Sequence, residues 1–141
     1  MTASPEEPTR AATRRAECSC GQLTAVAEGE PVRVSMCHCL ACQRRTGSTF
    51  GAQAWFPRGR VVTAGRASSY VRVADSGSRL TFHFCPACGA TVFYENEQVP
   101  DRVGVPVGAF ADPTFPPPRV SVYEDRRHAW TGTPEDVEHL A

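Results

Sequence analysis

Short runs of apolar and β-branched residues, interrupted by glycine and proline roughly every ten positions, dominate the pattern of this chain. Residues 80–84 show it most clearly, because Leu80, Phe82 and Phe84 alternate with polar neighbours, as in a half-buried strand. Further segments of the same character are 23–27, 32–36, 52–56, 61–63, 70–74, 91–94, 103–107 and 120–123. Many short strands with frequent turn signals predict a mostly β domain.

The connections between these segments predict local geometry. Residues 70–74 and 80–84 are joined by Asp-Ser-Gly-Ser, so we expect a hairpin there. Pro106 has no backbone N–H to donate, which predicts that its strand lies at an edge or carries a bulge. One short helix is expected at Cys42–Thr46, because Gly47 can end it in a left-handed conformation.

The two ends of the chain differ in composition from its centre. Residues 1–16 are rich in Pro, Glu, Thr and Arg and have no apolar residue larger than alanine after Met1, which predicts a disordered tail. Residues 131–141 are acidic and polar and predict a peripheral tail that forms a turn or a short helix. The intervening residues 17–130 contain no repeat or linker, so we expect one domain.

Composition narrows the classes of function. The 141 residues carry 15 basic and 15 acidic side chains, a neutral balance that does not favour a nucleic-acid-binding protein. All the basic residues are arginine, so Schiff-base chemistry by a lysine is excluded. No apolar run has the length of a membrane span, and the N-terminus lacks the features of a signal peptide, so we expect a cytoplasmic protein with no membrane partner.

The seven cysteines fall into three short clusters. These are Cys18 and Cys20, then Cys37, Cys39 and Cys42, then Cys85 and Cys88. Thiols stay reduced in the cytoplasm, and seven is an odd number, so closely spaced cysteines indicate metal ligands here rather than disulfides. A redox dithiol in the last cluster is disfavoured, because no thioredoxin-like β-α-β pattern surrounds it.

Zinc fits this spacing, since it takes thiolates about 2.3 Å away in a tetrahedral arrangement. In the third cluster, proline begins a tight turn and Gly89 lets the chain leave it. The first and third clusters together would close a four-ligand site, whereas the middle cluster supplies three ligands and leaves the fourth position for water or substrate, as in catalytic zinc sites. Spacing alone leaves a second division of the cysteines open, in which the second and third clusters share a metal site and Cys18 and Cys20 bind no metal.

Residues around the middle cluster are candidates for substrate binding. His38 lies between two predicted ligands, which favours a supporting or pocket role over coordination. Arg44 and Arg45 follow the cluster directly and could bind substrate carboxylates, although a solvated pair of surface arginines would look the same. Trp55 and Phe56 could line a pocket or pack in the core.

The order of the three clusters resembles the glutathione-dependent formaldehyde-activating enzyme family, which also includes centromere protein V. The similar motifs run from Glu17 to Trp130 and are Cys-x-Cys-Gly, Cys-His-Cys-x-x-Cys followed by Arg-Arg-Thr-Gly, Trp-Phe, and Cys-Pro-x-Cys-Gly. Residues 107–113 resemble a late family segment, except that Ala111 stands where an acidic residue is usual. That departure affects only the local pocket or turn.

The resemblance implies a single-domain β-tent, in which two antiparallel sheets meet at an angle with zinc-binding knuckles at the apex. It implies two zinc ions per chain: a structural ion on Cys18, Cys20, Cys85 and Cys88, and a catalytic ion on Cys37, Cys39 and Cys42. It also implies carbon–sulfur lyase activity, written as formation of S-(hydroxymethyl)glutathione from glutathione and formaldehyde. The implied partners are a small thiol and an aldehyde.

The sequence leaves two questions open: which thiol is the substrate, and whether the protein is an enzyme. Formaldehyde and thiols combine without help, so a member of such a family could act on adducts of another low-molecular-weight thiol. The exclusive use of arginine is compatible with a host whose abundant thiol is not glutathione. The alternative function is a non-enzymatic zinc-binding module for protein interaction, which would need only the closed site.

Overall fold

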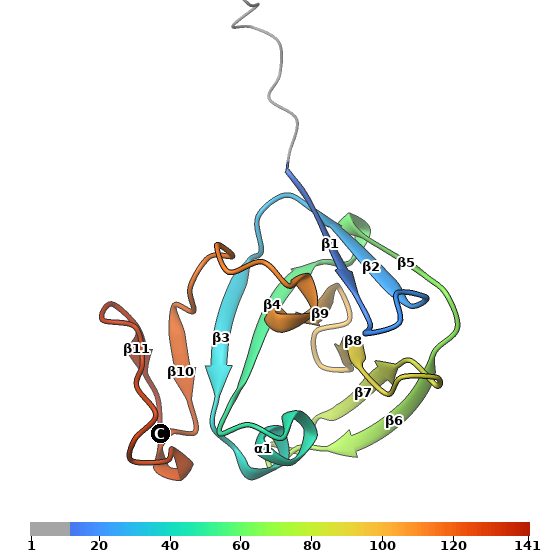
Figure 1. Ribbon diagram of the computed structural model, residues 1–141. Coiled ribbons are helices and arrows are strands. Elements are labelled where there is room, and N and C mark those ends of the chain that lie inside the picture. Colours follow the sequence, from blue (N-terminus) through green and yellow to red (C-terminus); the bar gives the residue numbers. More distant parts are fainter. Residues whose placement is uncertain (1–11) are drawn as a thin grey trace, which may run out of the picture.

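The computed structural model describes residues 12–141, which form two β-sheets and a few short helices (Figure 1). The small sheet has the order β1-β2-β5: β1 (Thr13–Glu17), β2 (Thr24–Glu28) and β5 (Val61–Ala64). The large sheet has the order β11-β10-β3-β4-β9-β8-β7-β6: β11 (Glu138–His139), β10 (Val120–Val122), β3 (Arg33–Cys37), β4 (Gly51–Pro57), β9 (Arg102–Pro106), β8 (Thr91–Asn96), β7 (Arg79–Phe84) and β6 (Ser68–Val73). The helices are α1 (Leu40–Thr46) and the 3-10 turns η1 (Arg58–Arg60), η2 (Val107–Phe110) and η3 (Glu124–Arg126).

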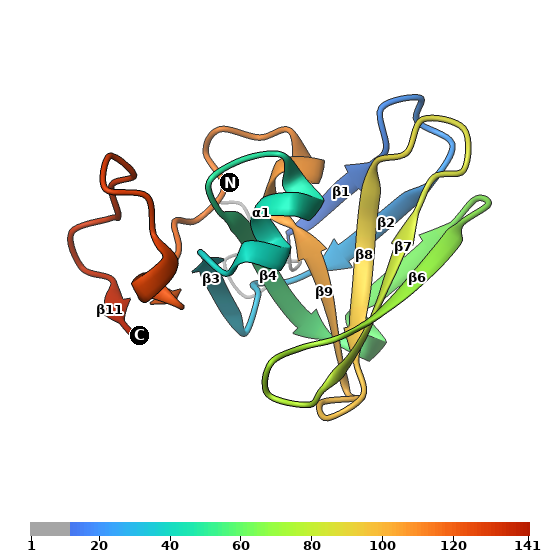
Figure 2. The ribbon, with the colours of Figure 1, turned by 90° about the horizontal axis from the view of Figure 1, so that it is seen from below.

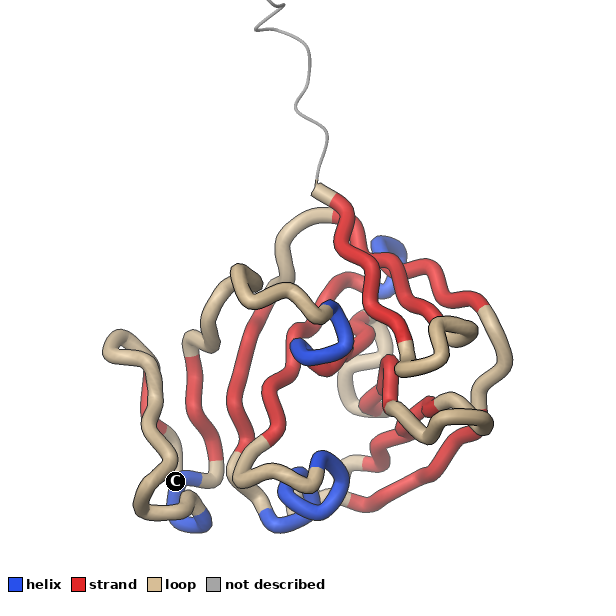
Figure 3. Tube along the Cα trace, viewed as in Figure 1, coloured by secondary structure: helices blue, strands red, loops and turns tan. Residues whose placement is uncertain are grey.

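The prediction of a mostly β fold with two sheets is confirmed, and strands make up most of the regular structure (Figure 3). Every predicted strand is present, and β6 and β7 form the expected hairpin, in register from Ser68 opposite Phe84 to Val73 opposite Arg79. The large sheet departs from antiparallel pairing at one edge, where β10 runs parallel to both β3 and β11. In the described part of the chain, no helix is long and apolar enough to cross a membrane.

The described residues near both ends of the chain are more ordered than their composition indicates. A disordered tail over residues 1–16 is wrong for its last part, because Thr13–Glu17 form β1 and pair with β2; residues 1–11 lie outside the described residues. Ala16 is fully buried in this strand, and an alanine is too weak a signal to reveal a strand from sequence. Residues 131–141 contain a turn at residues 135–136, one of the two predicted forms, and no helix; in addition Val137 is buried and β11 pairs with β10.

Pro106 does not mark an edge strand. It is the last residue of β9, which lies between β4 and β8 in the interior of the large sheet. The strand ends at the residue that cannot donate a hydrogen bond, and the chain continues directly into η2. The edge prediction is therefore wrong, because proline at a strand terminus leaves the rest of the ladder intact.

Helix α1 begins two residues earlier than predicted and uses a cysteine as its N-cap. The sulfur of Cys39 accepts a hydrogen bond from the Cys42 backbone N–H at 3.3 Å. The helix ends as predicted, at Gly47, which has a φ of 69° and donates its backbone N–H to the Gln43 carbonyl. A predicted metal ligand therefore also holds the first turn of this helix.

Alternation along β3 and β4 gives the large sheet two different faces. Val34, Ala54 and Phe56 point into the hydrophobic core, which Leu23 and Ala25 of the small-sheet region complete. Figure 2 shows the small sheet lying against the large one, with α1 at the end of β3. The residues between these core positions face the other way, and that second face carries the candidate site.

Candidate metal centres and active site

The first and third cysteine clusters meet where two loops come together. The loop between β1 and β2 lies beside the loop between β7 and β8 in both Figures 1 and 2. The sulfurs of Cys18, Cys20, Cys85 and Cys88 all lie within 4.8 Å of one another. The Cys20 sulfur is 3.7 Å from those of Cys18 and Cys85. A tetrahedral metal with bonds of about 2.3 Å would space its sulfurs by about 3.8 Å, so this cluster fits zinc.

Hydrogen-bond donors surround this cluster. Gln22 donates its side-chain N–H to the Cys85 sulfur at 3.0 Å, and this bond is the main reason why the pKa of Cys85 is lowered to about 6. The pKa of Cys20 is raised to about 11: the Gln22 backbone lowers it, but hydrogen bonds with Cys18 and Cys85 raise it more. The thiols of this cluster therefore differ in acidity: Cys85 loses its proton more readily than Cys20. A divalent cation bound among them would allow all four to be thiolates.

Gln22 is a supporting residue that the sequence did not reveal. Besides contacting Cys85, its side chain accepts from the Arg66 backbone N–H at 2.9 Å and donates to the Arg66 carbonyl at 2.8 Å. The connection after β5 is thereby tied to the loop that carries Cys18 and Cys20. The only sequence signal for Gln22 is its position between the first cysteine cluster and the strand predicted at 23–27.

Gly65, the residue before Arg66, gives a test of this connection. It has a φ of 101°, and a Cβ there would lie 2.0 Å from the Gln22 carbonyl oxygen. We expect Gly65→Ala to lower the free energy of unfolding by about 3 kcal/mol, since strain and a backbone clash add together. Gly77→Ala is the matched control, because Gly77 has a φ of 90° but no atom within 4 Å of the added Cβ. Urea unfolding followed by circular dichroism measures both, and equal losses would contradict the proposed clash.

The middle cluster forms a separate group. Cys37 ends β3, Cys39 caps α1, and Cys42 lies in its first turn, and their sulfurs are within 4.8 Å of one another. The structure thus brings together the first and third clusters and keeps the second apart, so the rival joining of the second and third clusters is not observed. Among residues 12–141, no fourth Cys, His, Asp or Glu belongs to the middle group.

The three thiols of the middle cluster differ in acidity. Hydrogen bonds from Cys37 and Cys42 lower the pKa of Cys39 to about 2, and nearby Arg72 adds to that effect. The same hydrogen bond raises the pKa of Cys37, whose burial raises it further. Negative charge therefore collects on Cys39, while its neighbours retain their protons unless a cation replaces them. A donor set of three converging sulfurs suits zinc.

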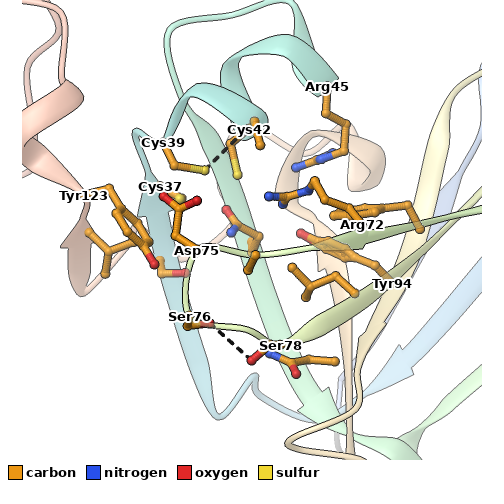
Figure 4. Close-up of a pocket in the computed structure, with 18 of the residues that line it drawn as sticks. Cys37, Cys39, Cys42, Arg45, Arg72, Asp75, Ser76, Ser78, Tyr94 and Tyr123 are labelled. Carbon is orange, nitrogen blue, oxygen red and sulfur yellow. Dashed lines mark hydrogen bonds between the residues drawn. The ribbon is translucent and has the colours of Figure 1, made fainter.

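This cluster borders a cavity of about 610 Å³ on the second face of the large sheet (Figure 4). The cavity is lined by every other residue of successive strands: Arg33, Ser35 and Cys37 of β3, Gln53 and Trp55 of β4, Tyr94 and Asn96 of β8, Leu80 and Phe82 of β7, and Arg72 of β6. Helix α1 and the loop between β6 and β7 cover its ends. The alternation of side chains along each strand, which predicts the strands from sequence, therefore also determines which residues face the cavity.

The cavity is strongly basic although the chain as a whole is neutral. Six arginines line it: Arg33, Arg44, Arg45, Arg72, Arg102 and Arg126. Its lining contains a single carboxylate, Asp75, which lies 3.6 Å from Arg126. Such a surface favours a ligand that carries negative charge.

Arg45 and Arg72 are held over aromatic rings rather than by acids. The Arg45 guanidinium carbon is 5.2 Å from the Phe82 ring centre and 5.3 Å from that of Tyr94, and Arg72 is 5.2 Å from Phe82. Neither arginine forms an ion pair within residues 12–141. Figure 4 shows both guanidinium groups beside Cys42. Arg72 was missed from the sequence because only the sheet brings it to the cluster.

The other sequence candidates divide between cavity and core. Arg44 and Trp55 line the cavity, whereas Phe56 is fully buried in the core. His38 is also fully buried, outside the cavity lining, and its Nε2 atom lies 2.9 Å from the Ser121 hydroxyl of β10. It therefore anchors the loop that carries Cys37 and Cys39 to the sheet. Burial lowers the pKa of His38, which suits a neutral structural imidazole.

Comparisons with known proteins identify both sequence and fold relatives. Residues 13–126 match the family described as "Glutathione-dependent formaldehyde-activating enzyme". The crystal structure of a Rhodobacter sphaeroides protein is similar with a TM-score of 0.53 and 19% sequence identity, covering 67% of this chain and 85% of that one. At that identity the likeness concerns the fold alone. No curated protein matches the sequence.

Proposed function

The chain belongs to the glutathione-dependent formaldehyde-activating enzyme family, and from that premise we propose that it is a carbon–sulfur lyase that joins a small thiol to an aldehyde and cleaves the adduct. The model reaction is formation of S-(hydroxymethyl)glutathione from glutathione and formaldehyde. One observation carries the proposal: three converging cysteines border a cavity of about 610 Å³ with six arginines in its wall. A cytoplasmic location would keep these thiols reduced.

We propose zinc in both cysteine clusters, with a different role in each. Cys18, Cys20, Cys85 and Cys88 would hold a structural ion, and Cys37, Cys39 and Cys42 would hold a catalytic one. When bound at the three-cysteine cluster, zinc would stabilise the thiolate form of the substrate. A non-enzymatic zinc module would need only the four-cysteine cluster, so the second cluster and its cavity favour the enzyme.

The chain's own residues would bind and orient the thiol. Arg45 and Arg72 present guanidinium groups that form no ion pair with residues 12–141; they lie beside the cluster and would hold a carboxylate of the substrate. In the addition direction, the sulfur forms a bond to the aldehyde carbon, the carbonyl π pair moves to oxygen, and that oxygen gains the proton that the thiol lost. Holding the thiol beside the aldehyde lowers the barrier by several kcal/mol, about the scale known for well-oriented reactants.

A panel of thiols would test the role of the arginines. We expect Arg72→Gln to raise the KM for glutathione about 30-fold, since a partly desolvated charge-assisted hydrogen bond contributes about 2 kcal/mol. The KM for 2-mercaptoethanol, which has no carboxylate, should change less than about twofold. Adduct formation can be followed by NMR exchange spectroscopy at constant ionic strength.

Arg79→Gln provides the matched control for this panel, because Arg79 is an exposed arginine of the neighbouring strand outside the cavity lining. It should leave both KM values unchanged. Equal effects of Arg72→Gln on glutathione and 2-mercaptoethanol would contradict carboxylate binding by Arg72.

A further inference from the structure

Three of the four buried side-chain polar atoms without a hydrogen-bond partner in the described part of the chain belong to residues of one cavity. Within residues 12–141 the four atoms are Arg45 Nε, Gln53 Oε1, Tyr94 Oη and His38 Nδ1. The first three belong to residues that line the cavity beside the three-cysteine cluster, and they come from α1, β4 and β8. Leaving such groups unpaired destabilises a fold, so their convergence indicates a ligand that supplies the missing partners.

Tyr94 is fixed in position by its neighbours. Its side chain is 2% exposed, stacks on Trp55 at 5.5 Å and meets the edge of Phe82 at 5.4 Å. Gly104 lies between Tyr94 and Trp55 in the sheet register, and a Cβ there would come within 3.0 Å of both rings. The ring therefore has little freedom to turn its hydroxyl elsewhere. Figure 4 shows that this hydroxyl points toward the space between Cys42, Arg45 and Arg72.

The Tyr94 hydroxyl is suited to donate a hydrogen bond. Burial raises the pKa of Tyr94, so the phenol keeps its proton at neutral pH. Gln53 offers the complementary function, because its buried carbonyl oxygen is an acceptor. Gln53 lies two residues from Trp55 on β4 and so on the same face of the sheet, next to the ring that stacks on Tyr94.

A donor and an acceptor in the wall of the same cavity match one group of the proposed adduct. The hydroxymethyl group formed from formaldehyde has one O–H to donate and oxygen lone pairs to accept. A free thiol lacks that oxygen, and free formaldehyde can only accept. Of the thiol, the unhydrated aldehyde and the adduct, only the adduct therefore carries the matching group.

We propose that Tyr94 and Gln53 form an oxygen subsite that holds the hydroxymethyl oxygen of the thiol–aldehyde adduct. Tyr94 donates to this oxygen as the carbonyl π pair moves onto it, and Gln53 accepts from the completed hydroxyl. The overall step is balanced: thiol plus formaldehyde gives the hydroxymethyl thioether, with the thiol proton ending on the new oxygen. This inference rests on the proposed function and gives the aldehyde, its second substrate, a binding position at Tyr94 and Gln53.

Calorimetric binding tests the subsite without relying on turnover. The zinc-loaded protein is titrated with glutathione alone and with glutathione pre-equilibrated with excess formaldehyde. We expect wild type to bind the hydroxymethyl adduct about 30-fold more tightly than glutathione, as two buried hydrogen bonds would allow. Tyr94→Phe should reduce that preference about tenfold while changing the affinity for glutathione less than about twofold.

Two controls keep the outcome specific. Tyr123→Phe removes another hydroxyl from the cavity lining and should leave the preference intact. Tyr94→Phe should also raise Tm by about 3 °C, because it removes a buried hydroxyl that has no partner. A merely structural role for Tyr94 would lower Tm instead.

The possible failures are distinguishable. If wild type prefers the adduct and Tyr94→Phe retains the full preference, the oxygen subsite is wrong while the proposed function stands. If wild type binds neither glutathione nor the adduct, the proposed function fails and the subsite fails with it. If glutathione and adduct bind wild type equally, Tyr94 and Gln53 hold no hydroxymethyl oxygen.

Discussion

Replacing Cys85 with serine should unfold this protein. Its sulfur is completely buried, lies 3.7 Å from that of Cys20, and belongs to the cluster that joins two loops 65 residues apart. Binding of structural zinc contributes about 10–16 kcal/mol in zinc-finger peptides, whereas a whole domain is stable by only about 5–15 kcal/mol. Loss of one ligand therefore removes a share of the stability comparable to the total. We expect a fall in Tm of at least about 20 °C, or no cooperative transition at all.

Thermal unfolding by circular dichroism, together with zinc content by mass spectrometry, measures this effect. Ala87→Ser is the control, because it places the same hydroxyl in the same exposed loop without removing a ligand. It should melt within a few degrees of wild type and keep two zinc ions per chain. A Cys85→Ser protein that also keeps two zinc ions and its Tm would contradict a structural metal at this cluster.

Replacing Cys39 with alanine should abolish activity and leave the protein folded. Cys39 is only partly buried and makes one capping hydrogen bond to α1, so its loss costs about 1 kcal/mol of stability. Its effect on the reaction is far larger, since the three-cysteine cluster would lose one of the three sulfurs proposed to hold the catalytic zinc. We expect adduct formation to slow by at least about 10³-fold, the scale on which a key electrostatic group acts. One zinc ion per chain should remain.

Metal content, Tm and the rate of adduct formation are measured on the same preparation. Leu40→Ala is the matched control, since Leu40 is the next residue and is 51% exposed. It should keep both zinc ions and most of the activity. If Cys39→Ala instead loses both metals and the fold, the division into a structural and a catalytic cluster is wrong. Full activity with both metals retained would remove the three-cysteine cluster from the reaction.

The sequence by itself determined the local elements and the chemistry of the candidate metal ligands. Strand period, turn residues and the glycine after α1 act over a few positions, so β2 to β10 and the end of α1 were predictable. Each cysteine cluster also lies within six consecutive residues or fewer, which makes it visible without a fold. Weaker signals failed: Ala16 did not reveal β1, and Pro106 predicted an edge strand or a bulge, whereas it ends a strand inside the large sheet.

Only the tertiary structure decided which distant residues share a site. The join between Cys20 and Cys85, like the approach of Arg72 to Cys39, depends on strand order and register across many residues, which local pattern does not encode. Tyr94 reads in the sequence as one more alternating aromatic. Its unpaired hydroxyl becomes meaningful only because Gly104 admits the ring beside Trp55 and the sheet turns it toward the cluster. The sequence thus specified the candidate metal ligands, and the register of the large sheet specified what surrounds them.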